Sequence, residues 1–242
     1  MNQNLSHLSD IDQPRPQTTV VTEILEKTFG VPEWRPHLDP LEELVACILS
    51  QHTSDINSFR AFDRLRERFA DWEAVRKAPV SDLADAIRCG GLADSKAPRI
   101  QKVLDLLQEK HGTITLNFLE EMTDEEARGY LLSFPGVGPK TAAIVLCFGM
   151  GRNVLAVDTH VFRVAWRLGL IEKKIGEAKA HDALQKQLEE GMAYRFHIAL
   201  ITHGRRTCKA ITPQCGVCPL TERCRYYKEV ILPVKAPPME ES

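Results

Sequence analysis

Apolar residues recur at helical spacing through most of the chain. After the helix breaker Pro40, apolar residues occupy positions 41, 44, 45, 48 and 49, one face of a helix. The same spacing continues over 56–69, where Ser54 or Asp55 is the expected N-cap. It returns over 100–107. These segments predict amphipathic helices that each bury one face.

Helix-start signals extend this pattern into the second half. The segment TDEEARGYLLSF opens with Thr123 and has Glu126 three residues later, which is the capping-box pattern. Further helices are expected at 138–149, 159–169, 178–189 and 192–203. No stretch alternates long enough to predict a strand, and no internal repeat is evident. The sequence therefore predicts an all-α fold of many helices with short loops.

Composition agrees with a soluble intracellular protein. The 242 residues suffice for one large domain or two small ones, and the apolar share of 43% is ordinary. No apolar run reaches the roughly 18–20 residues of a membrane span. The N-terminus has no apolar signal core, so we expect residues 1–18 to be a disordered tail.

Charge is unevenly distributed along the chain. Residues 131–228 hold 15 Lys and Arg against 7 Asp and Glu, whereas the remainder holds 16 against 26. A basic C-terminal half beside an acidic N-terminal half favours one face that binds a polyanion such as nucleic acid. Because solvated helices also scatter charge by chance, charge alone does not decide the partner.

Four of the seven cysteines form a compact C-x6-C-x2-C-x5-C cluster near the C-terminus. They are Cys208, Cys215, Cys218 and Cys224. An intracellular chain seldom keeps disulfides, so a metal or cluster site is the natural interpretation, and chance clustering is the weaker one. Without a nearby histidine to complete a finger pattern, four thiolates suit Zn²⁺ and [4Fe–4S] about equally. The surrounding arginines and lysine make a basic surface suited to phosphates.

The stretch FPGVGPKTAAIVL has three interpretations. A phosphate-binding P-loop is excluded because Pro139 rather than glycine precedes Lys140. An ordinary tight link between helices explains Gly136, Gly138 and Pro139, but it does not explain the lysine. A helix–hairpin–helix explains more, because its glycines admit a DNA backbone and its helix N-terminus points at a phosphate. Val137 would then plug the space between the two helices.

Lys140 and Asp158 are the candidate catalytic residues. Partial burial near the start of a helix would favour the neutral, nucleophilic form of the Lys140 amine. Eleven helical residues rise about 16 Å and the eight-residue loop 150–157 can span up to roughly 26 Å, so Asp158 can return beside Lys140. Taken by itself, Asp158 is explained more simply as the N-cap of the following helix. Beside a nucleophile, its carboxylate would activate the amine or stabilise a developing cation.

Several motifs together resemble the endonuclease III family of DNA glycosylases, in the helix–hairpin–helix superfamily. They are FPGVGPKTA, VDTHVFRV, HGRRTCKAITPQCGVCPLTERC, ILSQHTSD and GGLADSKAPRI, which span about 20–228. The resemblance implies two helical domains with DNA between them. A six-helix barrel would comprise 36–152, and a cluster domain would join 19–35 to 153–228, leaving 229–242 as a C-terminal tail.

The resemblance also implies the chemistry. Lys140 occupies the family's nucleophile position, Asp158 its essential carboxylate, and the four clustered cysteines would hold a [4Fe–4S] cluster rather than zinc. Lys140 would attack C1′ of a damaged nucleotide, release the base and form a Schiff base, and β-elimination would cut 3′ to the abasic site. The implied protein is a bifunctional DNA glycosylase/AP lyase for oxidised pyrimidines in base excision repair. It would act as a cytoplasmic, nucleoid-associated monomer on double-stranded DNA with damaged bases or abasic sites, and not at a membrane.

The family inserts side chains where the nucleotide leaves the stack. Leu92 matches the family's wedge, whereas His52 stands where endonuclease III carries a glutamine, and Gln51 lies one residue earlier. This departure bears on how the orphan base is contacted. The other residues expected to bind DNA are Gly136, Val137, Gly138, His160 and Arg205.

Three other functions compete with this one. A relative within the superfamily that acts on mismatches or other lesions is disfavoured as a monofunctional enzyme, because monofunctional relatives lack a lysine at the position of Lys140. A non-catalytic DNA-binding module would need neither Lys140 nor Asp158. A zinc-binding structural protein would explain only the cysteines.

Overall fold

The computed structural model describes residues 16–36 and 38–235. Twelve α-helices, with short 3₁₀ and π turns between them, make up this part of the chain, and it contains no strand. The helices are α1 (Gln17–Phe29), α2 (Pro40–Ser50), α3 (Asp55–Arg68), α4 (Trp72–Lys77), α5 (Val80–Ile87), α6 (Ala93–His111), α7 (Asp124–Leu132), α8 (Pro139–Ile144), α9 (Thr159–Leu168), α10 (Gly176–Gln185), α11 (Ala193–Arg206) and α12 (Leu232–Lys235). The predicted all-α fold is confirmed.

Local capping signals locate the helix starts well. Ser54 is the N-cap of α3, and Thr123 with Glu126 forms the predicted capping box of α7. The expected tails are too long at both ends: Gln17 and Thr18 belong to α1, and helical turns continue to Lys235. Residues 1–15 and 236–242 of those tails lie outside the described residues.

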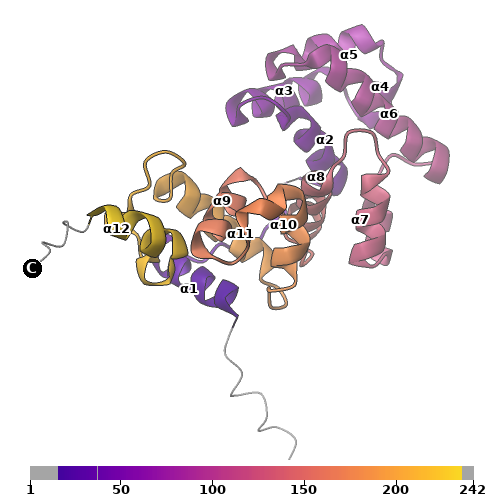
Figure 1. Cartoon of the computed structure of the whole chain (residues 1–242). Helices are drawn as coiled ribbons and strands as arrows, with labels where there is room; N and C mark the ends of the chain where they lie inside the picture. Colours follow the sequence, from indigo (N-terminus) through magenta and orange to yellow (C-terminus); the bar gives the residue numbers. More distant parts are fainter. Residues whose placement is uncertain (1–15, 37, 236–242) are drawn as a thin grey trace, which may run out of the picture.

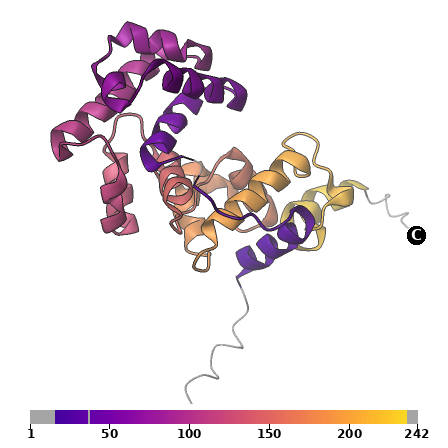
Figure 2. The same cartoon turned by 180° about the vertical axis from the view of Figure 1, so that it is seen from behind.

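The buried apolar side chains form two clusters, which appear as two lobes in Figure 1. The first cluster is built from helices α2 to α8, and the second from α1, α9, α10 and α11. Helix α1 packs against α11, so the N-terminal helix belongs to the C-terminal lobe (Figure 2). We propose that these two cores correspond to the barrel domain and the cluster domain expected from the sequence.

One helical segment connects the two cores. Helix α8 continues directly into a π turn, η3 (Val145–Gly149). Within this turn Val145 and Leu146 pack in the first core, whereas Cys147 packs in the second. The residues at the start of α8 are therefore held next to both lobes. Among the described helices, none is long and apolar enough to cross a membrane.

Candidate functional site

A tight hairpin joins α7 to α8. Gly136 adopts the left-handed conformation with φ 76°, which favours glycine, and Gly138 is the N-cap of α8. Pro139 occupies the first position of α8, as predicted. Val137 is 7% exposed and belongs to the first core, which is where a plug between two helices would lie.

Lys140 follows at the second position of α8, with an exposed side chain. The partial burial expected from the sequence is therefore wrong for the DNA-free protein. Its neighbour Thr141 is buried, so the backbone of the first turn is fixed while the lysine reaches outward. An exposed amine on a fixed turn is accessible to a large substrate.

Asp158 ends a buried linker and begins α9. It is 8% exposed, and its Oδ1 accepts a hydrogen bond from the backbone N–H of Val161 at 2.7 Å. The N-cap role proposed for this residue is confirmed. One carboxylate oxygen is used in capping, which leaves the rest of the group free to take part in chemistry.

A buried histidine that sequence reasoning missed lies within electrostatic reach of both candidate catalytic residues. His197 of α11 contacts the carbonyl oxygen of Ala156 through Nδ1 at 2.8 Å. Burial lowers the pKa of His197; the Ala156 carbonyl and the Asp158 carboxylate raise it, and Lys140 lowers it further. The structure therefore brings the charges of Lys140 and Asp158, from separate helices, to one region.

Two exposed residues have strained backbones. His52 (φ 55°) and Leu92 (φ 52°) are the only non-glycine residues with positive φ in the described ranges. Leu92 directly precedes α6 and is 56% exposed, and His52 lies in the turn between α2 and α3. Such strain costs about 1–3 kcal/mol and concentrates at functional sites. Both residues are those expected from the sequence to contact the DNA gap.

A buried lysine of α6 holds these two turns in place. Lys96 is 2% exposed, and its Nζ donates to the carbonyl oxygens of Leu49 at 2.7 Å and Gly90 at 2.9 Å. Burial lowers the pKa of Lys96. Leu49 lies three residues before His52, and Gly90 two residues before Leu92. A single ammonium group therefore connects the two strained turns.

Gln51 connects the first of these turns to the hairpin. Its Nε2 donates to the carbonyl oxygen of Gly136 at 3.1 Å, and its Oε1 accepts from Arg99 Nη1 at 2.7 Å. Arg99 also lies against Gly136, where a Cβ would come within 2.6 Å of it. Gln51 is thus directed at the protein itself, whereas the neighbouring His52 is exposed.

The two remaining DNA-binding candidates lie on the second lobe. His160 Nδ1 lies 3.0 Å from Arg163 Nη2, and its Cβ packs close to Gly204. Arg205, the next residue of α11, donates to Asp55 of α3 at 3.1 Å, an exposed ion pair between the two lobes. Both candidates flank the region that contains Asp158.

All four clustered cysteines line one cavity beside α9. Arg167 Nη1 donates to Cys208 Sγ at 3.3 Å, and the backbone N–H of Tyr227 donates to Cys224 Sγ at 3.4 Å. Burial raises the pKa of Cys218 to about 11. Nowhere in residues 16–36 and 38–235 do three or more His, Cys, Asp or Glu side chains lie close enough to hold a metal ion. Four thiols on one cavity, with N–H donors aimed at sulfur, nevertheless suit the ligand environment of an iron–sulfur cluster.

Comparison with known proteins gives one family. The model of the "HhH-GPD superfamily base excision DNA repair protein" family matches residues 45–190. Endonuclease III of Thermotoga maritima is 37% identical over 78% of this chain and 84% of its own length. The DNA glycosylase/AP lyase ROS1 of Arabidopsis thaliana is 33% identical over 65% of this chain, but only 12% of its own length.

A solved structure shares most of this architecture. It is a trapped covalent intermediate of endonuclease III with DNA, described as an estranged-adenine complex. The match covers 90% of this chain and 99% of the solved chain, with 30% sequence identity and a TM-score of 0.74. The chain thus matches both the sequence and the fold of this group of proteins.

Proposed function

The chain belongs to the HhH-GPD superfamily of base excision DNA repair proteins, and from this membership we propose that it is a bifunctional DNA glycosylase and AP lyase. Its substrate is duplex DNA that carries oxidised pyrimidines or abasic sites. The observation that carries the proposal is the common location of Lys140 and Asp158, whose charges both reach His197. Phosphate binding alone would not call for a carboxylate in the same region as the amine, because a carboxylate repels phosphate.

Lys140 is the proposed nucleophile. Its neutral amine attacks C1′ of the damaged nucleotide while the bond from C1′ to the base breaks, and the resulting Schiff base permits β-elimination 3′ to the sugar. Asp158 stabilises the cationic sugar or accepts a proton from the attacking amine. Its cap hydrogen bond fixes the carboxylate for this task.

The hairpin and the strained turns are the proposed DNA contacts. The N–H groups around Gly136 and Gly138 bind a phosphate, which holds DNA without reading its sequence. Leu92 and His52 fill the space that the extruded nucleotide leaves. Their exposure and left-handed backbones support this assignment. We infer that His52, rather than Gln51, faces the orphan base, because Gln51 is bonded to Gly136 and Arg99.

A covalent trap tests the proposed reaction. We expect borohydride to link the wild-type protein to a duplex with one abasic site, because reduction makes a Schiff base permanent. The protein should also cleave duplexes that contain a single oxidised pyrimidine, but not matched undamaged duplexes. Cleavage of a mismatch panel alone, or base release without an adduct, would contradict the proposal and favour a different lesion class.

A [4Fe–4S] cluster held by Cys208, Cys215, Cys218 and Cys224 is the proposed cofactor. It would tie together the loop from residue 208 to residue 224, which follows α11, and shape the basic surface for phosphate binding. We expect anaerobically purified protein to be brown, with absorption near ~400 nm. Cys218→Ser should lose the absorption, whereas Cys89→Ser, outside the cavity, should keep it. Colourless protein with stoichiometric zinc would contradict this assignment.

A further inference from the structure

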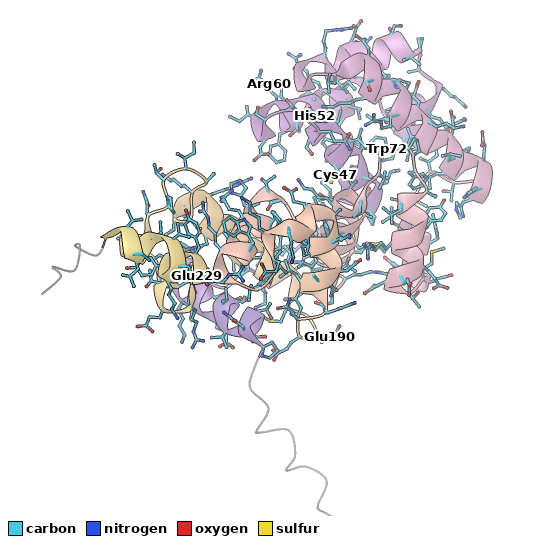
Figure 3. The ribbon with its side chains drawn as sticks, in the orientation of Figure 1. Cys47, His52, Arg60, Trp72, Glu190 and Glu229 are labelled. Atoms are coloured by element: carbon cyan, nitrogen blue, oxygen red, sulfur yellow. The ribbon has the colours of Figure 1, made fainter. Side chains whose placement is uncertain are left out.

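A cavity of about 520 Å³ lies between the two lobes. Its wall comes from α2, α3, α8, the π turn η3 and α11, and includes the rings of Phe59, Phe148 and Tyr194. Figure 3 labels Cys47, another lining residue, on the part of the upper lobe that lies toward the second lobe. Ligand pockets measure about 300–1,000 Å³ and combine apolar walls with a few polar groups. The cavity therefore has room for one nucleobase.

The cavity lies next to the proposed nucleophile. Ile144, four residues after Lys140 in α8, lines its wall and so lies on the same helix face as the lysine. Burial raises the pKa of Cys47 most and the charge of Glu43 raises it further, whereas the charge of Lys140 lowers it. A base that enters this cavity would leave its sugar near Lys140.

Glu43 brings an unpaired carboxyl to this cavity. It lies on α2 and is half-buried, and its carboxyl makes no hydrogen bond or ion pair among the described residues, although its backbone N–H donates to the Asp39 carbonyl oxygen. Burial raises the pKa of Glu43 from 4.5 to about 7. The π turn passes close by, because a Cβ on Gly149 would lie 3.5 Å from the Cβ of Glu43. A carboxyl in this position is protonated to a large extent near neutral pH.

None of the other described charged groups around the cavity offers an unpaired, half-buried carboxyl like that of Glu43. The other titratable and charged residues that line it are Arg35, Cys47, Asp55, Asp63 and Tyr194, and the charge of Lys140 reaches Cys47. Arg35 pairs with Glu33 at 2.6 Å, and Asp55 pairs with Arg205 at 3.1 Å. Asp63 lines the wall but its side chain is exposed, whereas Glu43 is half-buried.

Building on the glycosylase function proposed above, we propose that Glu43 is the acid that binds the extruded pyrimidine and protonates it as it leaves. A neutral carboxyl presents an O–H donor beside a C=O acceptor. This pair is complementary to the N3–H and C=O edge of a pyrimidine ring, including one whose C5–C6 bond is oxidised. Glu43 therefore contributes to selecting the base as well as to its departure.

Loss of the base and attack by Lys140 take place in the same proposed step. The C1′–N1 bond breaks with its electron pair going to the base, the neutral Lys140 Nζ forms the new bond to C1′, and Asp158 accepts the proton that this nitrogen then loses. The Glu43 O–H passes its proton to a carbonyl oxygen of the departing base, which leaves as a neutral molecule. Glu43 remains as a carboxylate and takes up a proton from water before the next cycle.

Glu43→Gln tests this step in single-turnover kinetics. Glutamine keeps a donor and an acceptor but has no acidic proton, so release of an oxidised pyrimidine should slow by about 10²-fold or more. The wild-type rate should fall as the pH rises through about 7, because the acid form of Glu43 is lost, and Glu43→Gln should lack this falling limb. Cleavage of a preformed abasic site has no base to protonate, so it should change less than about threefold.

Two further variants control for folding and for charge. Asp63→Asn removes a carboxyl from the same cavity and should keep both the rate and the falling limb. Glu43→Leu removes all polarity and should slow base release at least as much as Glu43→Gln, while borohydride trapping on abasic DNA verifies that each variant is folded. Glu43→Gln with the wild-type rate and pH profile would overturn the assignment.

Failure of the role proposed for Glu43 can be distinguished from failure of the proposed lyase function. A wild type that is trapped on abasic DNA but releases no oxidised pyrimidine would overturn the proposed lesion class and the role of Glu43 with it. A wild type that cannot be trapped at all would overturn the proposed lyase function itself.

Discussion

Lys140→Ala is expected to abolish the borohydride adduct and to slow strand cleavage at abasic sites by at least about 10³-fold. Formation of a Schiff base requires a primary amine at C1′, and alanine offers none. The side chain of Lys140 is exposed, so the free energy of unfolding should change by less than about 0.5 kcal/mol. The loss should therefore be chemical rather than structural.

A second lysine variant serves as a control that distinguishes loss of the nucleophile from loss of a positive charge. Lys102 is exposed on α6, so Lys102→Ala removes the same charge from a surface outside the candidate site. This variant should give wild-type adduct yield and cleavage. The measurements are adduct yield on denaturing gels and duplex affinity at two salt concentrations. An adduct of undiminished yield from Lys140→Ala would show that another amine is the nucleophile.

Local chemistry explains why much of the fold was predictable. The capping box at Thr123 and Glu126, the N-cap at Asp158 and the proline at the start of α8 depend on neighbours in sequence, and all three are found in the structure. The helix–hairpin–helix geometry follows from the same signals, because Gly136 alone permits its left-handed turn.

The supporting residues depend on tertiary contacts and were not predictable. Lys96 sits in a polar stretch that is typical of a solvated helix start, but its ammonium caps two carbonyl groups from other segments. Glu43 lies beside Glu42 in an ordinary first helical turn, and only the approach of the second lobe encloses it. His197 has the spacing of a core residue, and nothing local indicates the charges that surround it. The partial burial expected for Lys140 was wrong for the same reason, because the exposure of its side chain also depends on which segments pack around α8.

Asp158 has two roles to be separated, because a helix cap and a catalytic carboxylate would look alike in a simple truncation. Asparagine is as good an N-cap as aspartate, since its side-chain oxygen also accepts from the N–H of Val161. Alanine cannot cap at all, and such a loss typically costs about 1 kcal/mol. Comparing the two substitutions therefore distinguishes the structural contribution from the chemical one.

Asp158→Asn should keep the free energy of unfolding within about 0.5 kcal/mol of wild type but slow base release by about 10²–10³-fold. The amide has no charge to stabilise a cationic sugar and cannot accept a proton from Lys140. Asp158→Ala should lose the same activity and also about 1 kcal/mol of stability. Denaturant unfolding and single-turnover kinetics measure the two effects separately. If Asp158→Asn were as active as wild type, Asp158 would be only the cap of α9, and the cation would have to be stabilised by another group.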